Sequence, residues 1–379
     1  MNSQNILIIC PFFRPNIGGV ESHLDLLTKY LVKNNYKTTV LTYKPLTTKT
    51  NDYQKIEKTK NLNIYRFWWF GNKIFDKTTA YPILQFIYII PGLLLHTFFY
   101  FLNNYKKIDI VHAHGFAAAF ITRFCCLFFK NKRLIVSTHY LYPNLDISQI
   151  STKILKWTFF GFNKILTVSE KSTQQLQKIG LSKTKMVKYQ HWLDPKIYLP
   201  KKISSLSKYK LKLLFVGRVI SMKGVFNLLH AAQKLPSDIL FTIVGDGPDF
   251  NQLKQESSSL NNFNLIGKKQ PLEIIEYYQE HDFTVLPSLA PEAQPMTVME
   301  SLMCGTPVIT TNKGSVTDMY NLSIGISLDP TVDNLYQTII NLYQKPDNIK
   351  QMKSLCRSFA IKKFGPKNAE IITKSYKYD

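Results

Sequence analysis

Two glutamates spaced eight residues apart carry the clearest chemical signal in this sequence. Glu292 and Glu300 lie in the segment LPSLAPEAQPMTVMESLMCGTPVIT, and Pro295 between them stands where a helix would begin. The unpaired N–H groups at a helix start form a site for anions. A loop carboxylate and a helical carboxylate on either side of such a site predict a ligand that carries both phosphate and hydroxyl groups.

Two cations form a second candidate group. Arg218 and Lys223 follow the strand-like run LKLLFVG, at the end of a strand where ligands bind in open α/β sheets. A guanidinium and an ammonium group that converge there can neutralise a pyrophosphate. Glycine turns also follow other strand-like runs, at Gly18-Gly19 and at Gly245.

The elements that position these residues alternate between strands and helices. The chain opens with NILIICPFF, the glycine pair and a stretch in which Leu24, Leu27 and Leu31 recur at helical spacing. Strand-like runs then alternate with helix-length segments, which predicts an α/β fold of doubly wound parallel sheets covered on both faces. The further runs are KTTVLTY, NIYRFW, IDIVHAH, RLIVSTH, KILTVS, LKLLFVG, FTIVG, NLIG, FTVLP, PVIT and GISL.

The length and one polar stretch predict two domains. A chain of 379 residues suits two α/β domains better than one core. Residues 196–210 are rich in Lys and Ser without periodicity, and they are interpreted as a linker. We therefore expect an N-terminal domain at 1–200 and a C-terminal domain at 201–363.

Charge and cysteine content narrow the class of partner. The net charge is +23, and residues 1–200 hold 27 Lys and Arg against 9 Asp and Glu. A basic surface attracts nucleic acid, anionic membranes or phosphorylated substrates, although a Lys-rich surface alone would also account for it. No nucleic-acid-binding signature is present, so nucleic acid is not expected. Five cysteines without CxxC spacing, and no signal peptide, favour the cytoplasm.

An uncharged run at residues 82–102, PILQFIYIIPGLLLHTFFYFL, is long enough to span a bilayer. One crossing would separate strands that belong to one sheet, which argues against spanning. A buried core helix and an apolar surface resting on anionic headgroups stay open. The flanking cations are typical of the second interpretation; they are Lys73, Lys77, Lys106, Lys107, Lys130, Lys132 and Arg133.

The order of these motifs resembles the retaining GT-B glycosyltransferases of family 4. The Glu292–Glu300 segment is similar to the family's Glu-x7-Glu motif, and VGRVISMKG to its Gly-Arg-x4-Lys-Gly pattern. IVGDGP, PNIGGVES and VHAHG resemble its Gly-x-Gly-Pro turn, N-terminal glycine loop and His-x-His, and together the motifs cover nearly the whole chain. The resemblance implies two Rossmann-like domains that face each other across a cleft holding the active site, and a tail at 364–379 that packs back on the N-domain.

The resemblance also implies roles for single residues. Glu292 would bind hydroxyls of the transferred sugar, Glu300 the ribose, and Arg218 with Lys223 the leaving diphosphate. His114 would face the reacting sugar; it shares one side of a strand with His112. The residues expected to be catalytic are Glu292, His114, Arg218 and Lys223. Those expected to bind the donor are Gly18, Gly19, Arg218, Lys223, Gly245, Glu292, Met296, Thr297 and Glu300.

Some positions depart from the family pattern, and for His139 the sequence allows two roles. Gln294-Pro295 replaces the usual Phe-Gly pair, and Asp318 stands where the family usually has Glu after a glycine pair. His139 is either a residue of the cleft or a structural histidine. Asp194, before the linker, is expected to be structural.

We therefore expect a retaining hexosyltransferase that uses a UDP- or GDP-linked sugar as donor substrate, with no cofactor. No Asp-x-Asp pair is present, so no metal site is expected. The expected acceptor is a lipid or lipid-linked glycan, with the enzyme peripheral on the cytoplasmic, anionic membrane face. A sugar-nucleotide epimerase, a catalytically silent binding partner and a transferase with a soluble acceptor are the alternatives.

Overall fold

The chain folds into two compact α/β units. Unit 1 comprises Met1–His191 and Lys367–Asp379, and unit 2 comprises Trp192–Pro366. This computed structural model describes residues 4–48, 50–70, 74, 82–130, 132–142, 145–146, 148–201 and 208–377. The parallel sheets of the two units confirm the fold class expected from the alternating strands and helices.

The boundary between the units lies nearer the N-terminus than residue 200, because the segment that follows His191 is tied to unit 2. Leu193 N donates to Phe364 O at 2.9 Å, and the Arg357 guanidinium donates to the carbonyl oxygens of Pro195 and Tyr198. Residues 202–207 of the expected linker lie outside the described residues.

Unit 1 is built on an eight-stranded sheet within the described residues. Its strands, in spatial order, are β3 (Ile56–Lys58), β4 (Leu62–Phe67), β2 (Lys37–Tyr43), β1 (Asn5–Ile9), β5 (Ile110–His114), β6 (Arg133–Thr138), β7 (Lys164–Thr167) and β8 (Met186–Lys188). All neighbours pair in parallel except β3, which forms an antiparallel hairpin with β4. β3 and β8 are edge strands of three residues that the sequence analysis did not predict.

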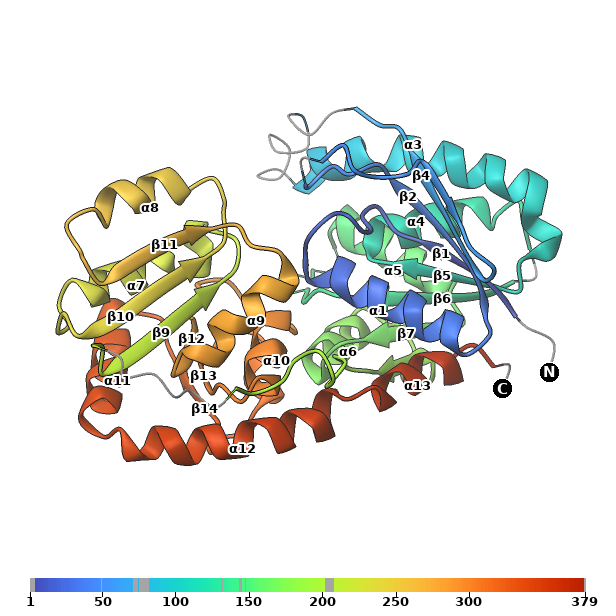
Figure 1. The fold of residues 1–379 in the computed structure, drawn as a ribbon. Coiled ribbons are helices and arrows are strands. Elements are labelled where there is room, and N and C mark those ends of the chain that lie inside the picture. The colour runs from blue at the N-terminus through green and yellow to red at the C-terminus, as the bar shows by residue number, and fades with distance from the viewer. Residues whose placement is uncertain are drawn as a thin grey trace. The chain divides into compact units, whose positions relative to one another are not determined.

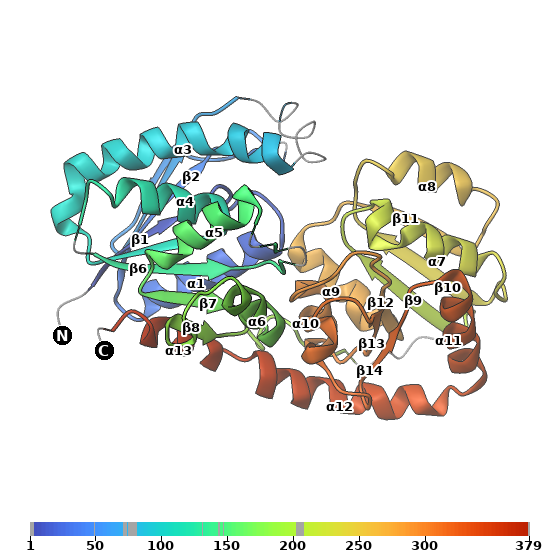
Figure 2. The same ribbon diagram turned by 180° about the vertical axis from the view of Figure 1, so that it is seen from behind.

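Helices cover both faces of this sheet. They are α1 (Gly19–Lys33), α3 (Pro82–Asn104), α4 (Phe116–Cys125), α5 (Ile150–Phe160), α6 (Glu170–Lys178) and α13 (Lys367–Lys374). Figure 1 shows α1 in front of the sheet, and the reverse view of Figure 2 shows α3, α4 and α5 side by side on the other face. The C-terminal segment joins this unit through Arg133 Nε, which donates to Ser375 O at 2.8 Å.

Helix α3 corresponds to the uncharged run of the sequence. With the turn that follows it, Leu84–Lys107, it is long and apolar enough to cross a membrane by length and composition alone. One stripe of the helix, which includes Ile89, Leu93 and Phe101, is buried in the core of unit 1. Another stripe is exposed, so α3 combines the core helix and the apolar surface that the sequence left open. The flanking Lys73 and Lys77 lie outside the described residues.

Unit 2 contains a six-stranded parallel sheet within its described residues. Its strands, in spatial order, are β11 (Phe263–Gly267), β10 (Ile239–Val244), β9 (Leu211–Val216), β12 (Phe283–Leu286), β13 (Val308–Thr311) and β14 (Gly325–Leu328). Its helices are α7 (Val225–Ala232), α8 (Phe250–Glu256), α9 (Pro271–Glu280), α10 (Met296–Met303), α11 (Val332–Gln344) and α12 (Asp347–Phe364). The carboxyl ends of β10, β9 and β12 are therefore neighbours, and the loops after them carry most of the predicted motifs.

Candidate functional site

Glycines bring the loops after β9, β10 and β12 into close contact. A Cβ on Gly245 would lie 1.8 Å from Gly217 O, and one on Gly224 would lie 1.9 Å from Pro287 O. Gly224 also has a φ of 74°, which side chains other than glycine rarely adopt. These contacts account for Gly224 and Gly245 by packing alone, and they align the loops that hold the charged residues.

Lys223 and Glu292 meet at the ends of the adjacent strands β9 and β12. Lys223 Nζ lies 2.5 Å from Glu292 Oε1, and the side chains of the two residues are 30% and 12% exposed. Ser288 Oγ donates to the same carboxylate oxygen. Glu292 Oε2 has no partner among the described residues, so it is available to accept a hydrogen bond from a ligand hydroxyl.

The backbone of Glu292 is held in place from both sides. Glu292 N donates to Lys313 O at 3.2 Å, and Ser315 N donates to Glu292 O at 2.8 Å. Gly314 lies between these two partners with a φ of 95°, and a Cβ on it would be 2.2 Å from Glu292 O. This clamp fixes the backbone from which the Glu292 side chain extends.

Arg218 differs from Lys223 in its surroundings. It is exposed on the loop after β9, and its guanidinium makes no hydrogen bond or ion pair with any described residue. Its charge is therefore free to act on an anionic ligand. The structure places both cations after β9, but only Lys223 contacts another predicted site residue.

Glu300 occupies the middle of α10 and already has two hydrogen-bond donors. Tyr278 OH donates to its Oε2 at 2.8 Å, and Tyr198 OH donates to its Oε1 at 3.3 Å. Burial raises the pKa of Glu300, while the two tyrosines lower it. A carboxylate accepts about four hydrogen bonds, so two positions remain for ribose hydroxyls.

The start of α10 differs by one residue from the prediction. Pro295 is the N-cap and not the first helical residue, because its ψ of 124° is extended, and α10 begins at Met296. No side chain caps this start, so its first N–H groups can bind an anion. Met296 is buried, and Thr297 Oγ1 donates to Val216 O at 3.4 Å.

In unit 1, Gly18 and Gly19 stand at the start of α1. Gly18 is the N-cap and Gly19 the first helical residue. A Cβ on Gly18 would lie 2.3 Å from Glu21 Oε2, so a carboxylate of this chain occupies the space beside the loop. Burial raises the pKa of Glu21, which favours the neutral acid there.

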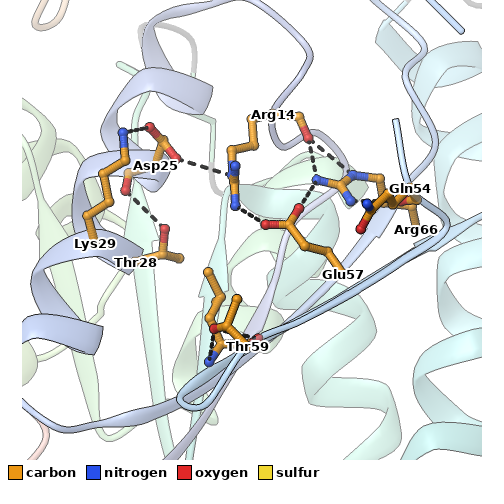
Figure 3. Close-up of polar contacts among 9 residues, drawn as sticks. Arg14, Asp25, Thr28, Lys29, Gln54, Glu57, Thr59 and Arg66 are labelled. Atoms are coloured by element: carbon orange, nitrogen blue, oxygen red, sulfur yellow. Dashed lines mark hydrogen bonds and ion pairs between the residues drawn. The ribbon is translucent and has the colours of Figure 1, made fainter. Parts of the chain in front are cut away.

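An ion-pair network holds the loop that leads to these glycines (Figure 3). Arg14 pairs with Asp25 on α1 at 3.3 Å and with Glu57 on β3 at 2.5 Å. Arg66, on β4, pairs with Glu57 at 3.3 Å and donates to Arg14 O. Burial lowers the pKa of Arg66, and Glu57 opposes this effect. The network neutralises Arg14, which positions the loop and is not a free cation for a ligand.

Five buried histidines gather at the carboxyl ends of the strands of unit 1: His23, His112, His114, His139 and His191. His112 and His114 lie on one side of β5, with ring centroids 4.1 Å apart. His112 contacts Tyr376 OH at 2.8 Å and Ser137 Oγ at 2.9 Å. Burial lowers the pKa of His112 and of His191 to about 3 and lowers those of the other three.

Three of these rings form a hydrogen-bonded chain. His114 Nδ1 lies 3.2 Å from His139 Nε2, and His139 Nδ1 lies 3.2 Å from His191 Nε2. A neutral imidazole donates from one nitrogen and accepts at the other, so His139 must do both. The direction in which the three rings donate their hydrogen bonds therefore decides whether Nε2 of His114 carries a proton. His139 is thus a buried, hydrogen-bonded member of this histidine chain, as a structural histidine would be.

Within the described residues, no group of three or more His, Cys, Asp or Glu side chains is arranged to hold a metal ion. His139 illustrates why, because its two neighbours bind nitrogens on opposite edges of its ring.

Two other positions singled out in the sequence are Asp318 and Asp194. Asp318 is exposed, and its carbonyl oxygen accepts a hydrogen bond from Lys363. Asp194 accepts a hydrogen bond from Lys196 N at 2.9 Å within a turn, as expected of a structural residue.

The sequence analysis did not find several partners of the predicted residues. Ser288, Tyr198 and Tyr278 contact the two glutamates, and His23 and His191 complete the histidine cluster. Ser288 precedes Glu292 by four residues and could have been found by its position in the motif. The others come from distant elements, and no local signal marks them.

Two family models match the chain. The one described as "Glycosyl transferases group 1" matches residues 200–358, and the one described as "Glycosyltransferase Family 4" matches residues 17–195. The matches cover most of unit 2 and most of unit 1.

Individual proteins are similar at low identity. The phosphatidylinositol N-acetylglucosaminyltransferase GPI3 subunit of Saccharomyces cerevisiae is 24% identical over 369 residues, covering 93% of this chain and 76% of its own. Sucrose-phosphate synthase from Thermosynechococcus elongatus has a TM-score of 0.81 at 16% identity, over 98% of both chains. Anabaena HepE, solved with UDP and glucose, has a TM-score of 0.77 at 16% identity, over 98% of both chains. These structural similarities confirm the GT-B fold class.

Proposed function

We propose that this chain, which belongs to the group 1, family 4 glycosyltransferases with the GT-B fold, transfers a hexose-type sugar from a UDP- or GDP-linked donor to a lipid or lipid-linked saccharide. Glycosyl transfer is the activity of the family, whereas the donor, the acceptor and the mechanism are our proposals.

The observation that carries the proposal is the contact between Lys223 and Glu292. A cation and a carboxylate meet 2.5 Å apart at the ends of adjacent strands, and Glu292 Oε2 stays available. A sugar nucleotide offers a hydroxyl-bearing ring joined to a diphosphate, which matches this pair. Glu292 would accept hydrogen bonds from the sugar, while Lys223 would turn to the diphosphate.

Cleavage of the anomeric bond leaves negative charge on the diphosphate oxygen. Lys223, the exposed Arg218 and the uncapped start of α10 would stabilise that charge in the transition state. These groups supply the charge stabilisation for which other transferases use a metal, so we propose a metal-independent reaction without a cofactor. We also propose retention of the anomeric configuration, by resemblance to the family.

The remaining donor contacts follow from the surroundings of each residue. Glu300, ordered by Tyr198 and Tyr278, would accept hydrogen bonds from the ribose. In unit 1, the backbone at Gly18-Gly19 would approach the phosphates once the Glu21 side chain moves aside. His114 would face the sugar, with its tautomer set by the chain through His139.

Two observations support a lipid acceptor. A similar protein from Saccharomyces cerevisiae is named for transfer to phosphatidylinositol, a lipid. In addition, α3 exposes large apolar side chains in the strongly basic unit 1. We therefore propose a peripheral enzyme on the cytoplasmic face of a membrane.

A donor screen followed by a product assay tests the proposal. A UDP- or GDP-sugar that binds only the folded protein should raise its melting temperature. The same donor with membrane lipid extract should then yield a glycosylated lipid, detected by mass spectrometry. An isomerised nucleotide sugar formed without acceptor would instead indicate an epimerase. Donor binding with no product from lipid or soluble acceptors would contradict transferase activity.

A further inference from the structure

The outward faces of α3, α4 and α5 in unit 1 expose a continuous set of apolar side chains. The three helices lie side by side on one face of the sheet (Figure 2). On α3 the exposed residues recur at intervals of three, four or eight, which puts them on one stripe opposite the buried one. They are Leu84, Ile87, Leu95, Phe99 and Leu102.

The other two helices extend this stripe. On α5, exposed apolar residues recur at Ile150, Ile154, Trp157 and Phe160, with Ile150 75% and Phe160 62% exposed. On α4, Phe124 is 37% exposed, and Phe128, after the end of this helix, is 65% exposed. Ring contacts connect the helices, since Phe98 and Phe128 are 5.9 Å apart and Phe120 and Trp157 are 5.8 Å apart. A patch of this kind on a soluble protein marks an interaction site.

A small basic pocket adjoins this apolar face. Its volume is about 180 Å³, and its lining residues are Arg123, Lys130, Lys132, Cys126, Phe129 and Leu134. The Phe129 ring packs 5.4 Å from Phe101 at the end of α3 and 5.2 Å from Tyr105 in the turn that follows. The pocket therefore joins the ends of α3 and α4.

The three cations of the pocket have no acidic partner among the described residues. Arg123 lies 5.5 Å from the Trp157 ring, and its Nε is buried without a hydrogen-bond partner. Lys132 Nζ lies 4.5 Å above the Tyr105 ring. Aromatic contacts thus hold two of the cations in place, while Lys130 is exposed. Three uncompensated charges around one pocket suit a phosphate group.

The charged side chains on the three helices have one sign. Helices α3, α4 and α5 contain no Asp or Glu, whereas α5 adds Lys153 and Lys156 to the cations at the pocket. An apolar surface with basic residues around it is complementary to an anionic lipid bilayer, which offers phosphates above hydrocarbon. A second copy of this face would instead bring like charges together.

We propose that α3, α4 and α5 form a membrane-docking face, and that the pocket of Arg123, Lys130 and Lys132 binds the phosphate of an anionic phospholipid. The exposed side chains of all three helices enter the boundary between headgroups and acyl chains. Helix α3 does not cross the bilayer, because its other stripe is packed in the core of unit 1. This face would place the enzyme beside the lipid acceptor of the proposed function, on which its biological role rests, although docking requires neither donor nor acceptor.

Co-sedimentation of the full chain with vesicles tests this assignment. The probes are vesicles of phosphatidylcholine with and without phosphatidylglycerol, in the absence of sugar nucleotide. We expect binding to the anionic vesicles at low salt and weaker binding at high salt, because the electrostatic contribution is screened. Protein that stays in the supernatant with anionic vesicles at low salt would overturn the proposal.

A variant of the pocket distinguishes specific phosphate binding from attraction by the net positive charge of the protein. Lys130→Gln with Lys132→Gln should weaken binding to anionic vesicles about 25-fold, at about fivefold per charge. The matched control is Lys33→Gln with Lys37→Gln, which removes equal charge at exposed positions on α1 and β2. Equal losses in the two variants would show attraction by net charge alone and would overturn the pocket.

An apolar variant tests the second helix. Ile150→Gln with Phe160→Gln should measurably weaken the binding that survives high salt, to which α3 also contributes. The control, Leu272→Gln with Leu322→Gln, changes residues of unit 2 that are 68% and 85% exposed, and it should bind as the wild type does. Unchanged binding of the α5 variant would remove α5 from the docking face.

Inorganic phosphate distinguishes a lipid headgroup from the free anion. Phosphate that raises the melting temperature of the wild type but not of the pocket variant, with no vesicle binding, would assign the pocket to a soluble anion and contradict our proposal. Because these assays contain no donor, docking without transfer would refute the proposed function alone. Transfer to detergent-dispersed lipid without docking would refute this inference alone.

Discussion

The two units present their charged and titratable groups in opposite ways. In unit 2, Lys223 and Glu292 form a short ion pair at the strand ends, and Arg218 is exposed beside them. In unit 1, the strand ends carry neutral histidines, and three uncompensated cations, Arg123, Lys130 and Lys132, line a pocket. This contrast is the basis of our proposals that unit 2 binds a small polar anion and that unit 1 contacts an extended anionic surface.

The largest expected effect concerns the stability of unit 1 in acid. Burial lowers the pKa of His112 and His191 to about 3, from an ordinary value of 6.5. Their neutral forms are favoured in the fold, so stability is complete above about pH 6.5 and falls as the unfolded chain takes up protons. Two such groups cost about 3 kcal/mol between pH 7.5 and 5.5, and the other three histidines add to this.

Hydrogen exchange measured by mass spectrometry can follow each unit separately through this pH range. Unit 1 should lose protection at higher pH than unit 2. His112→Gln should reduce the pH dependence, whereas His230→Gln, at an exposed position in unit 2, should leave it unchanged. Equal loss of protection in both units would remove the contrast between them.

A smaller effect is expected where Gly314 holds Glu292 in unit 2. Gly314→Ala adds a Cβ 2.2 Å from Glu292 O in a left-handed conformation, so stability should fall by more than about 1 kcal/mol. Displacement of Glu292 should also lower the transfer rate by roughly 100-fold. Gly267→Ala is the matched control, since Gly267 has a φ of 79° with open space around it. It should cost about 1 kcal/mol and leave the rate intact.

Glu292 and the histidines also show what the sequence could predict. Lys223 and Glu292 could be predicted as site residues, because both follow parallel strands and lie within motifs of fixed spacing, but their ion pair was not predicted. The tyrosine partners of Glu300 were not, since residues 198 and 278 approach it only through tertiary packing. Nor could the contact between His23 and His191 be predicted, because these residues are far apart in the sequence and meet only in the folded unit 1.

The exact ends of helices and the short edge strands could not be predicted from the sequence either. Pro295 fits either the N-cap or the first helical residue, and only its ψ of 124° distinguishes the two. β3 and β8 have three residues each and no alternating pattern, so pairing with a neighbour defines them.

A more moderate effect is expected at Arg218, which has no partner in the described structure. Arg218→Gln should weaken nucleotide-sugar binding roughly 10- to 100-fold, since a charged hydrogen bond contributes about 1.5–3 kcal/mol. Stability should change by less than about 0.5 kcal/mol, as is typical of surface positions. Calorimetric titration with the donor measures the first effect, and Lys254→Gln, exposed on α8, is the control. Unchanged donor affinity would exclude Arg218 from the site.

The smallest expected effect is that of metal removal. If Arg218 and Lys223 stabilise the diphosphate, excess EDTA should leave the transfer rate unchanged. Loss of activity on chelation, restored by manganese or magnesium, would show that unit 2 requires a cation these side chains do not replace.

The transfer rate of Glu292→Gln tests the central claim most directly. The change removes the charge that pairs with Lys223 but keeps the size of the side chain, so the protein should stay folded, as circular dichroism can check. We expect the rate to fall by about 10²- to 10³-fold, as for the loss of one transition-state contact. Glu276→Gln, the same change at an exposed site on α9, should be fully active. A Glu292→Gln enzyme that keeps more than about half of the wild-type rate would contradict the claim that this pair performs the transfer.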